Sequence, residues 1–207
     1  MTDNRIIGVL GGSFNPIHKG HMEIAVKTHE QFHIPEILLM HTANNYYKDN
    51  SDLLDGETRL KMVELAISDF NKDIEEPYIF SSSLDIDRGG ITYTADTIKD
   101  LSAVYDTIYF IIGSDSLMYI HTWKNIRSIL QNATVLYAKR NTDDQKEIEE
   151  QIIKLNNIYQ ADIRPILIED QPFSSSMIRQ IIKHNGDIRP YVSDSVYRYI
   201  KNNRLYQ

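Results

Sequence analysis

Short apolar runs alternate along the chain with longer segments whose apolar residues recur at helical spacing. The short runs predict buried strands, and the longer segments predict amphipathic helices. The predicted strands are Ile6–Leu10, Ile37–Met40, Tyr78–Phe80, Thr107–Ile112, Thr134–Ala138, and a last strand over Ile163 and Ile166–Ile168 that Pro165 interrupts. Strands that alternate with helices in this way predict an α/β fold with a doubly wound parallel sheet.

The helical segments carry recognisable start signals. The first predicted helix begins near Lys19, the second covers Leu60–Phe70, and the third starts at an N-cap formed by Thr94. The fourth covers Asp143–Asn157. The last two cover Ser175–His184 and Ser193–Asn202, with Ser193 as the N-cap of the final helix. No internal repeat or low-complexity linker separates these elements. We therefore expect residues 1–207 to form a single domain whose C-terminal helical part begins at about residue 174.

Composition narrows the class of protein. The absence of cysteine excludes a disulfide, a thiolate zinc site and a catalytic cysteine. The net charge of −7, with no long basic run, argues against a nucleic-acid partner. No apolar run approaches the roughly 18 residues of a membrane span, and no signal peptide is recognisable. We expect a cytoplasmic protein with no membrane partner; a homo-oligomer is compatible with the sequence.

Ligands of doubly wound sheets bind beyond the carboxyl ends of the strands. The segments that follow the predicted strands are Gly11–His21, His41–Lys48, Gly113–Leu117 and Gln171–Arg179. In the first of them, Gly11 and Gly12 allow backbone N–H groups to approach an anion closely. His18 and His21 are three residues apart at a predicted helix start, so they share one face. With the unpaired N–H groups of that helix start, they indicate a phosphate site.

Other roles for the histidines are weighed against this one. Zinc normally needs three or four protein ligands, and no partner cluster at ligand spacing accompanies the pair, so we expect no metal site. A structural role is the alternative for His18 and His21. We expect that structural role for the remaining histidines, which are His29, His33, His41, His121 and His184.

A second polar motif follows the last predicted strand. Ser174, Ser175 and Ser176 stand at a predicted helix start, and Arg179 lies about one turn along the same helix. Serine hydroxyls and an arginine in this arrangement suit a polyphosphate. The alternative for Ser174 or Ser175 is simple helix capping, which does not exclude anion binding.

These motifs resemble those of a known family. Gly12–His21 resembles the (H/T)xGH signature of the nucleotidyltransferase α/β-phosphodiesterase superfamily, and Ser174–Arg179 resembles its SSTxIR signature, with serine where threonine is commoner. Within the superfamily, the chain is most similar to the bacterial nicotinate-nucleotide adenylyltransferases. Four further stretches support that similarity: Tyr93–Thr97, Phe110–Leu117, Trp123 with Lys124, and Gly186–Val192.

The resemblance implies a Rossmann-like nucleotidyltransferase fold and a reaction of NAD biosynthesis. Nicotinate mononucleotide would attack the α-phosphorus of ATP, accompanied by Mg²⁺, to give deamido-NAD and pyrophosphate without a covalent enzyme intermediate. The implied catalytic residues are His18, His21, Lys48 and Arg179. The implied ATP-binding residues are Gly11, Gly12, Ser13, Phe14, Gly113, Asp115, Ser174, Ser175 and Ser176. The implied acceptor-binding residues are Asn15, Lys48, Thr94 and Trp123.

Two of the acceptor residues have ordinary alternatives, which are core packing for Trp123 and helix capping for Thr94. One segment departs from the family, which usually carries a PxxxPPHK stretch after the second strand. The run His41–Lys48 keeps the lysine, Lys48, but lacks the prolines and the histidine. The nature of the acceptor therefore stays open between nicotinate mononucleotide, nicotinamide mononucleotide and another phosphorylated compound. A non-catalytic nucleotide sensor is the alternative from a different class.

Overall fold

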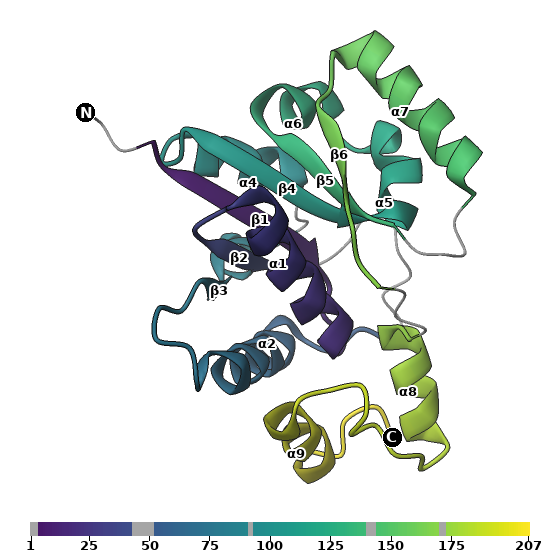
Figure 1. Cartoon of the computed structure of the whole chain (residues 1–207). Coiled ribbons are helices and arrows are strands. Elements are labelled where there is room, and N and C mark those ends of the chain that lie inside the picture. Colours follow the sequence, from purple (N-terminus) through teal and green to yellow (C-terminus); the bar gives the residue numbers. More distant parts are fainter. Residues whose placement is uncertain (1–3, 43–51, 91–92, 140–143, 170–172) are drawn as a thin grey trace. The chain divides into compact units, whose positions relative to one another are not determined.

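The computed structural model describes residues 4–42, 52–90, 93–139, 144–169 and 173–207. Within these residues, six strands form one sheet in the order β3-β2-β1-β4-β5-β6 (Figure 1). The strands are β1 (Ile6–Gly12), β2 (Ile37–His41), β3 (Ile79–Ser82), β4 (Thr107–Gly113), β5 (Thr134–Ala138) and β6 (Ile163–Ile166). The order along the sheet reverses next to β1, which is the arrangement of a doubly wound fold, so the predicted fold class is confirmed.

Helices connect the strands. They are α1 (Lys19–Phe32), α2 (Gly56–Asn71), α3 (Leu84–Arg88), α4 (Thr94–Ser102), α5 (Ser114–Tyr119), the 3₁₀ helix η1 (Ile120–Thr122), α6 (Ile126–Asn132), α7 (Gln145–Tyr159), α8 (Ser175–Lys183) and α9 (Asp194–Asn202). The sequence pattern does not predict α3, α5, η1 or α6. None of these exceeds seven residues, and two turns or fewer are too short to show a full apolar stripe.

The chain divides into two compact units. Unit 1 comprises Met1–Gly11, Val26–Leu38 and Tyr93–Asp170, and unit 2 comprises Gly12–Ala25, Leu39–Thr92 and Gln171–Gln207. Each unit is therefore assembled from segments that are distant in sequence. The expectation of a single domain stays a prediction.

In unit 1, β1, β4, β5 and β6 are parallel neighbours, with Leu10 of β1 opposite Ile111 of β4. Parallel strands in register end at the same edge of the sheet, and β4 and β5 end there with Gly113 opposite Ala138. Phe32 of α1 packs against Tyr109, and Trp123 packs against Phe110. Tyr109 and Phe110 are consecutive residues of β4, so their side chains point to opposite faces of the sheet. Helical segments therefore cover both faces, as a doubly wound fold requires.

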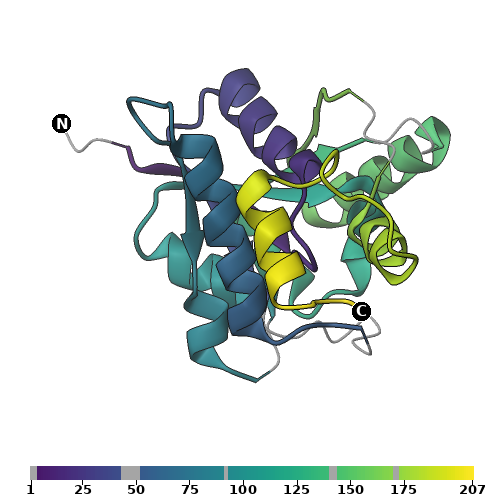
Figure 2. The same ribbon diagram turned by 90° about the horizontal axis from the view of Figure 1, so that it is seen from below.

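In unit 2, α9 runs beside α2, which also packs on β3 (Figure 2). The carboxylate of Asp69 in α2 accepts hydrogen bonds from the backbone N–H of Ser195 (2.9 Å) and from its hydroxyl (2.7 Å). Ser193 occupies the N-cap position of α9 as predicted, but its side chain makes no capping hydrogen bond. The side chain of Asp69 therefore takes over the role that we expected of the Ser193 hydroxyl.

Three predicted boundaries need correction. Helix α4 begins at Thr94, and its N-cap is Tyr93, whose backbone is still extended, so Thr94 is not the cap. Strand β6 runs through Pro165 and ends at Ile166; a proline is tolerated there because β6 is an edge strand. Helix α7 begins two residues later than expected, after Asp144, whose carboxylate accepts from the amides of Lys146 and Glu147.

Candidate functional site

The loop after β1 leads into α1 through an unusual helix cap in unit 2. The backbone N–H of His18 donates to Nδ1 of His21 (3.2 Å), and the backbone N–H of His21 donates to the carbonyl of His18 (2.9 Å). The side chain of His21 thus plays the part that Glu or Gln plays in a capping box, but the amide of His21 binds the backbone carbonyl of His18 and not its side chain. Because Nδ1 of His21 accepts a hydrogen bond, the proton of its neutral ring is on Nε2.

The two imidazoles are stacked, as the expected shared face requires. Their ring centroids are 3.7 Å apart, with an angle of 21° between the planes. Phe14 meets the ring of His21 at 5.0 Å, and Phe173 meets the ring of His18 at 5.4 Å, both edge to face. The histidine pair is therefore held between two phenyl rings, which fixes the direction of both imidazoles.

The backbone amides at the start of α1 are largely engaged within the protein. The N–H of Lys19 donates to the carbonyl of Tyr191 (2.8 Å), and its ammonium donates to the carbonyls of Arg189 (3.2 Å) and Pro190 (3.0 Å). Together with the cap described above, the amides of His18, Lys19 and His21 all have protein partners. These three amides are therefore not unpaired, as the sequence analysis assumed, and their contact with an anion stays a prediction.

The serine-rich motif at α8 meets the histidine loop. Ser175 donates from its hydroxyl to the carbonyl of Pro16 (2.8 Å). Arg179 donates from Nη1 to the carbonyl of Asn15 (2.8 Å) and from Nη2 to the hydroxyl of Ser176 (3.3 Å). Two motifs that lie some 160 positions apart in sequence thus form one cluster.

Ser174 acts as the N-cap of α8, where its hydroxyl accepts from the amide of Met177 (3.2 Å). The capping interpretation of Ser174 is thereby confirmed. Phosphate contacts of Ser174, Ser175 and Ser176 stay predictions.

Gly12 is required by close packing. A Cβ atom on Gly12 would lie 2.8 Å from Cε1 of Phe14, whose ring is buried. Phe14 itself has a left-handed backbone, with φ of 45°, which is strained for an aromatic residue. A Cβ on Gly11 would be at an ordinary distance of 3.4 Å from Phe110. Of the two glycines, Gly12 is the one that shapes the loop.

Arg59 of α2 is a site residue that the sequence analysis missed. Its side chain is 1% exposed. Nε donates to the carbonyl of Leu54 (2.7 Å), and Nη1 donates to the carbonyls of Ser13 (2.8 Å) and Thr42 (2.9 Å). The guanidinium therefore ties the loop after β1 to the loop after β2 and to the start of α2. Its signal in the sequence was a charged residue in register with the buried stripe of α2.

His41, at the end of β2, lies beside Arg59, which donates to its Nδ1 (3.3 Å). Burial, together with the charge of Arg59, lowers the pKa of His41 to about 3. Burial also lowers the pKa of Arg59, to about 10, which leaves it charged at neutral pH. His41 is therefore a neutral structural residue in the folded protein.

Unit 1 holds the expected ribose and pyridine residues. Gly113 is the N-cap of α5, and Asp115 stands in its first turn with an exposed side chain. A Cβ on Gly113 would meet Oδ1 of Asp115 at 2.5 Å, so a glycine here lets that carboxylate lie against the backbone.

Trp123 is 8% exposed and packs edge to face against Phe110 of β4, at 6.1 Å. Its neighbour Lys124 places its ammonium 3.8 Å from the ring centre of Tyr93, directly before Thr94. The loop of Trp123 and the start of α4 are therefore joined. Burial supports the packing role of Trp123, and stacking on a pyridine ring stays a prediction.

The sequence analysis also placed Lys48 and Asn15 at the site. Lys48 lies outside the described residues. Asn15 is 5% exposed, and its side chain already has protein partners; contact with an acceptor stays a prediction.

In the described part of the chain, no three or more His, Asp or Glu side chains are grouped so that they could hold a metal ion. No helix there combines the length and apolar character of a membrane span.

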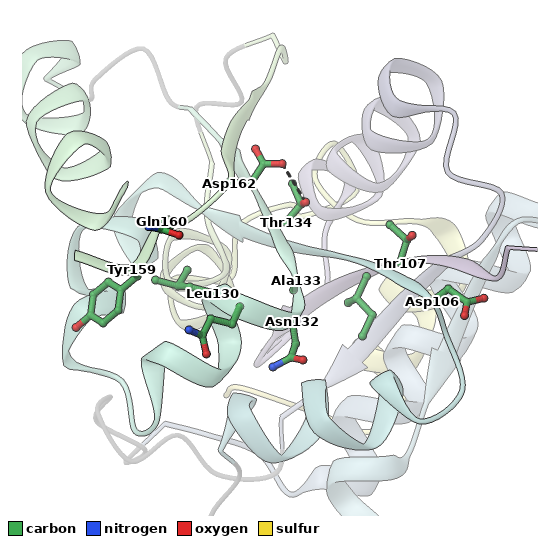
Figure 3. A pocket seen from close by; sticks show the side chains of 11 residues that line it. Asp106, Thr107, Leu130, Asn132, Ala133, Thr134, Tyr159, Gln160 and Asp162 are labelled. Atoms are coloured by element: carbon green, nitrogen blue, oxygen red, sulfur yellow. Dashed lines mark hydrogen bonds between the residues drawn. The ribbon is translucent and has the colours of Figure 1, made fainter. Parts of the chain in front are cut away.

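A separate hollow of about 440 Å³ lies at the opposite edge of the unit 1 sheet (Figure 3). Asp106 and Thr107 at the start of β4, Thr134 at the start of β5, and Asp162 before β6 contribute to its lining. Asp162 accepts from the Thr134 hydroxyl (3.2 Å) and is paired with Arg164. None of the predicted site residues lines this hollow.

Comparison with known proteins decides the family. Residues 9–181 match the cytidylyltransferase-like family. A relative from Lachnoclostridium phytofermentans, named "probable nicotinate-nucleotide adenylyltransferase", is 35% identical over 98% of this chain and 99% of its own length. One of the same name from Clostridium acetobutylicum is 34% identical over 96% and 97%. The chain belongs to the nicotinate-nucleotide adenylyltransferase family.

Solved structures agree on the fold of this family. The nicotinic acid mononucleotide adenylyltransferase of Plasmodium falciparum, complexed with NaAD, superposes with a TM-score of 0.77 at 21% identity, covering 98% of this chain and 97% of that one. A second structure of the Plasmodium falciparum protein, complexed with APC, superposes with a TM-score of 0.74 at 24% identity, again covering 98% of this chain and 97% of that one. At these identities the superpositions establish the nucleotidyltransferase fold.

Proposed function

We propose that this chain catalyses adenylyl transfer from ATP to nicotinate mononucleotide, with deamido-NAD and pyrophosphate as products. The observation that carries the proposal is the cluster in unit 2, where Arg179 and Ser175 bind the loop of the stacked His18–His21 pair. The names of the full-length relatives supply the acceptor, because they are nicotinate-nucleotide adenylyltransferases.

The chemistry needs charge stabilisation rather than a protein nucleophile. A phosphate oxygen of the mononucleotide attacks the α-phosphorus of ATP, and the bond from that phosphorus to the β-phosphate oxygen breaks. His21 would donate from Nε2–H to a phosphate oxygen, because its Nδ1 is occupied. His18, stacked on it, would supply the second donor. Arg179 would add a fixed positive charge for the leaving pyrophosphate.

Further roles are assigned on the family pattern. Gly11, Gly12, Ser13, Phe14 and the serines Ser174, Ser175 and Ser176 would contact the ATP phosphates, and Gly113 and Asp115 the ribose. Thr94, Trp123, Asn15 and Lys48 would contact the mononucleotide. Mg²⁺ would arrive as part of the ATP substrate, since phosphates and water supply the oxygen ligands that it prefers.

The acceptor is tested by comparing kcat/KM for nicotinate mononucleotide and nicotinamide mononucleotide, with dinucleotide product separated by chromatography. We expect a preference for the nicotinate substrate of at least about tenfold, or about 1.4 kcal/mol in transition-state binding. An equal or larger preference for the amide would overturn the acceptor while leaving the adenylyl transfer intact.

Catalysis is tested separately with His21→Ala. We expect pyrophosphate release to fall by about 10² or more, as for the loss of a transition-state donor, while binding of a non-hydrolysable ATP analogue persists. The matched control is His184→Ala, on an exposed imidazole at the end of α8, which should turn over like the parent. A parent protein that binds ATP but releases no pyrophosphate with either mononucleotide would favour the sensor instead.

A further inference from the structure

The segment that follows α9 folds back onto the histidine loop within unit 2. The hydroxyl of Tyr206 donates to Oδ1 of Asn15 at 2.8 Å, across 191 positions of sequence. Asn15 directly precedes Pro16 and Ile17 in the loop that ends at His18. A side chain near the end of the chain thus contacts the loop that carries the phosphate-binding histidines.

The backbone after α9 takes a defined path to make this contact. Arg204 and Tyr206 both have left-handed backbones, with φ of 50° and 64°. The amide of Leu205 donates to the carbonyl of Ile200 (3.0 Å), which closes the end of α9 and turns the chain back. Left-handed conformations are costly for residues other than glycine, so the tertiary contacts of the segment must hold Tyr206 in place.

Asn15 is a junction between four segments. Its Nδ2 donates to the carbonyl of Asp52 (2.9 Å), and its Oδ1 also accepts from the amide of Leu54 (3.4 Å). Its backbone carbonyl accepts from Arg179 (2.8 Å). The amide of Leu54 is at the long end of hydrogen-bond distance, so the Tyr206 hydroxyl is the shorter of the two contacts to Oδ1.

Burial keeps the Tyr206 hydroxyl protonated, so that it acts as a donor. Burial raises the pKa of Tyr206 above its ordinary value, although the charges of Arg179 and Arg59 oppose this. The hydroxyl is therefore protonated at neutral pH and donates to the Asn15 carbonyl oxygen. It neither gives nor takes a proton in the proposed reaction.

We propose that Tyr206 is a positioning residue for phosphate chemistry: its hydroxyl fixes Asn15, and through Asn15 the loop and the orientation of the His18–His21 pair. The effect of Tyr206 on catalysis rests on the proposed function. Its effect on the histidines does not, since the ring orientations can be observed without substrate.

The test is Tyr206→Phe, which keeps the ring and removes the hydroxyl. Only one hydrogen bond is lost, so the variant is expected to fold, and a thermal melt checks this. In the parent, ¹H–¹⁵N spectra of the imidazoles should show His21 as a single Nε2–H tautomer. In Tyr206→Phe, we expect a mixture of tautomers for His21 and a fall in kcat of about tenfold at assay temperatures well below the melt.

The control is Tyr199→Phe on α9, whose hydroxyl makes no hydrogen bond within the described part of the chain. It should match the parent in both spectra and kcat. Tyr206→Phe with parental imidazole spectra would overturn the proposal, whatever its activity. If the parent itself makes no dinucleotide, the proposed function fails, and the spectra alone still decide the positioning role.

Discussion

Arg179 holds Asn15: Nη1 of the guanidinium is 2.8 Å from the backbone carbonyl oxygen, and 164 positions separate the two residues. This contact brings the arginine of the serine-rich motif to the loop of the histidine motif. Because Nη2 also contacts Ser176 (3.3 Å), the planar fork of the arginine has two directed partners.

We therefore expect Arg179→Lys to lower activity although it keeps the charge. A lysine ammonium does not reproduce the two directed contacts of the fork. The expected loss in kcat/KM for ATP is about tenfold or more, or about 1.4 kcal/mol, measured by pyrophosphate release. The control is Lys183→Ala, one turn further along α8. Lys183 forms an exposed ion pair with Asp52 (3.4 Å), and its loss should leave activity unchanged. A fully active Arg179→Lys would refute the role of the fork.

Gly12→Ala should disturb both stability and activity. Its Cβ would be 2.8 Å from the buried ring of Phe14, and that ring packs on His21 at 5.0 Å. Overpacking of this kind costs about 1–3 kcal/mol, which urea unfolding can measure. For the free energy of unfolding, Gly11→Ala is the matched control, since its Cβ would make an ordinary contact of 3.4 Å with Phe110. Equal losses of stability in the two variants would contradict the packing argument.

Acid should destabilise the protein through His41. Its pKa is about 3 in the folded state and about 6.5 in an unfolded chain. The unfolded state then binds the proton more readily, so this contribution is intact above about pH 6.5 and is lost as the pH falls toward 3. The expected slope is up to about 1.4 kcal/mol per pH unit.

The measurement is urea unfolding between pH 7 and pH 5 for the parent and for His41→Asn. The asparagine oxygen can accept the Arg59 hydrogen bond in place of Nδ1, but asparagine does not titrate. We expect a flatter dependence of unfolding free energy on pH in the variant. The same slope in both proteins would show that His41 does not cause the acid sensitivity.

Arg59→Met should be strongly destabilising. The substitution leaves the carbonyls of Leu54, Ser13 and Thr42 without the guanidinium that they bind. Each buried carbonyl that loses its donor costs about 1–3 kcal/mol, so we expect the free energy of unfolding to fall by about 3 kcal/mol or more. Lys61→Met is the control. It removes the exposed ion pair with Glu64 of the same helix and should change the free energy of unfolding by less than about 1 kcal/mol. A similar small change for Arg59→Met would mean that the loops are held by other contacts.

The sequence predicts the strands and the longer helices because burial imposes a periodicity that local spacing reveals. It misses α5 and α6, which are too short for a stripe. It places the N-cap of α9 correctly at Ser193, but it cannot show that the acceptor at this helix start is Asp69 from another helix. Arg59 also escapes a local interpretation, since arginine is normally exposed and only its distant partners explain its burial.

The sequence by itself determined the fold class, the two polar motifs and the family, because these depend on patterns within short segments. Only the tertiary structure decided how Arg179, Ser175 and Tyr206 converge on the residues Asn15 and Pro16. It also decided that the amide of His18 binds a histidine side chain and that the amide of Lys19 binds a backbone carbonyl. Hydrogen bonds between distant segments depend on how the chain packs, and that packing leaves no periodic trace along the sequence.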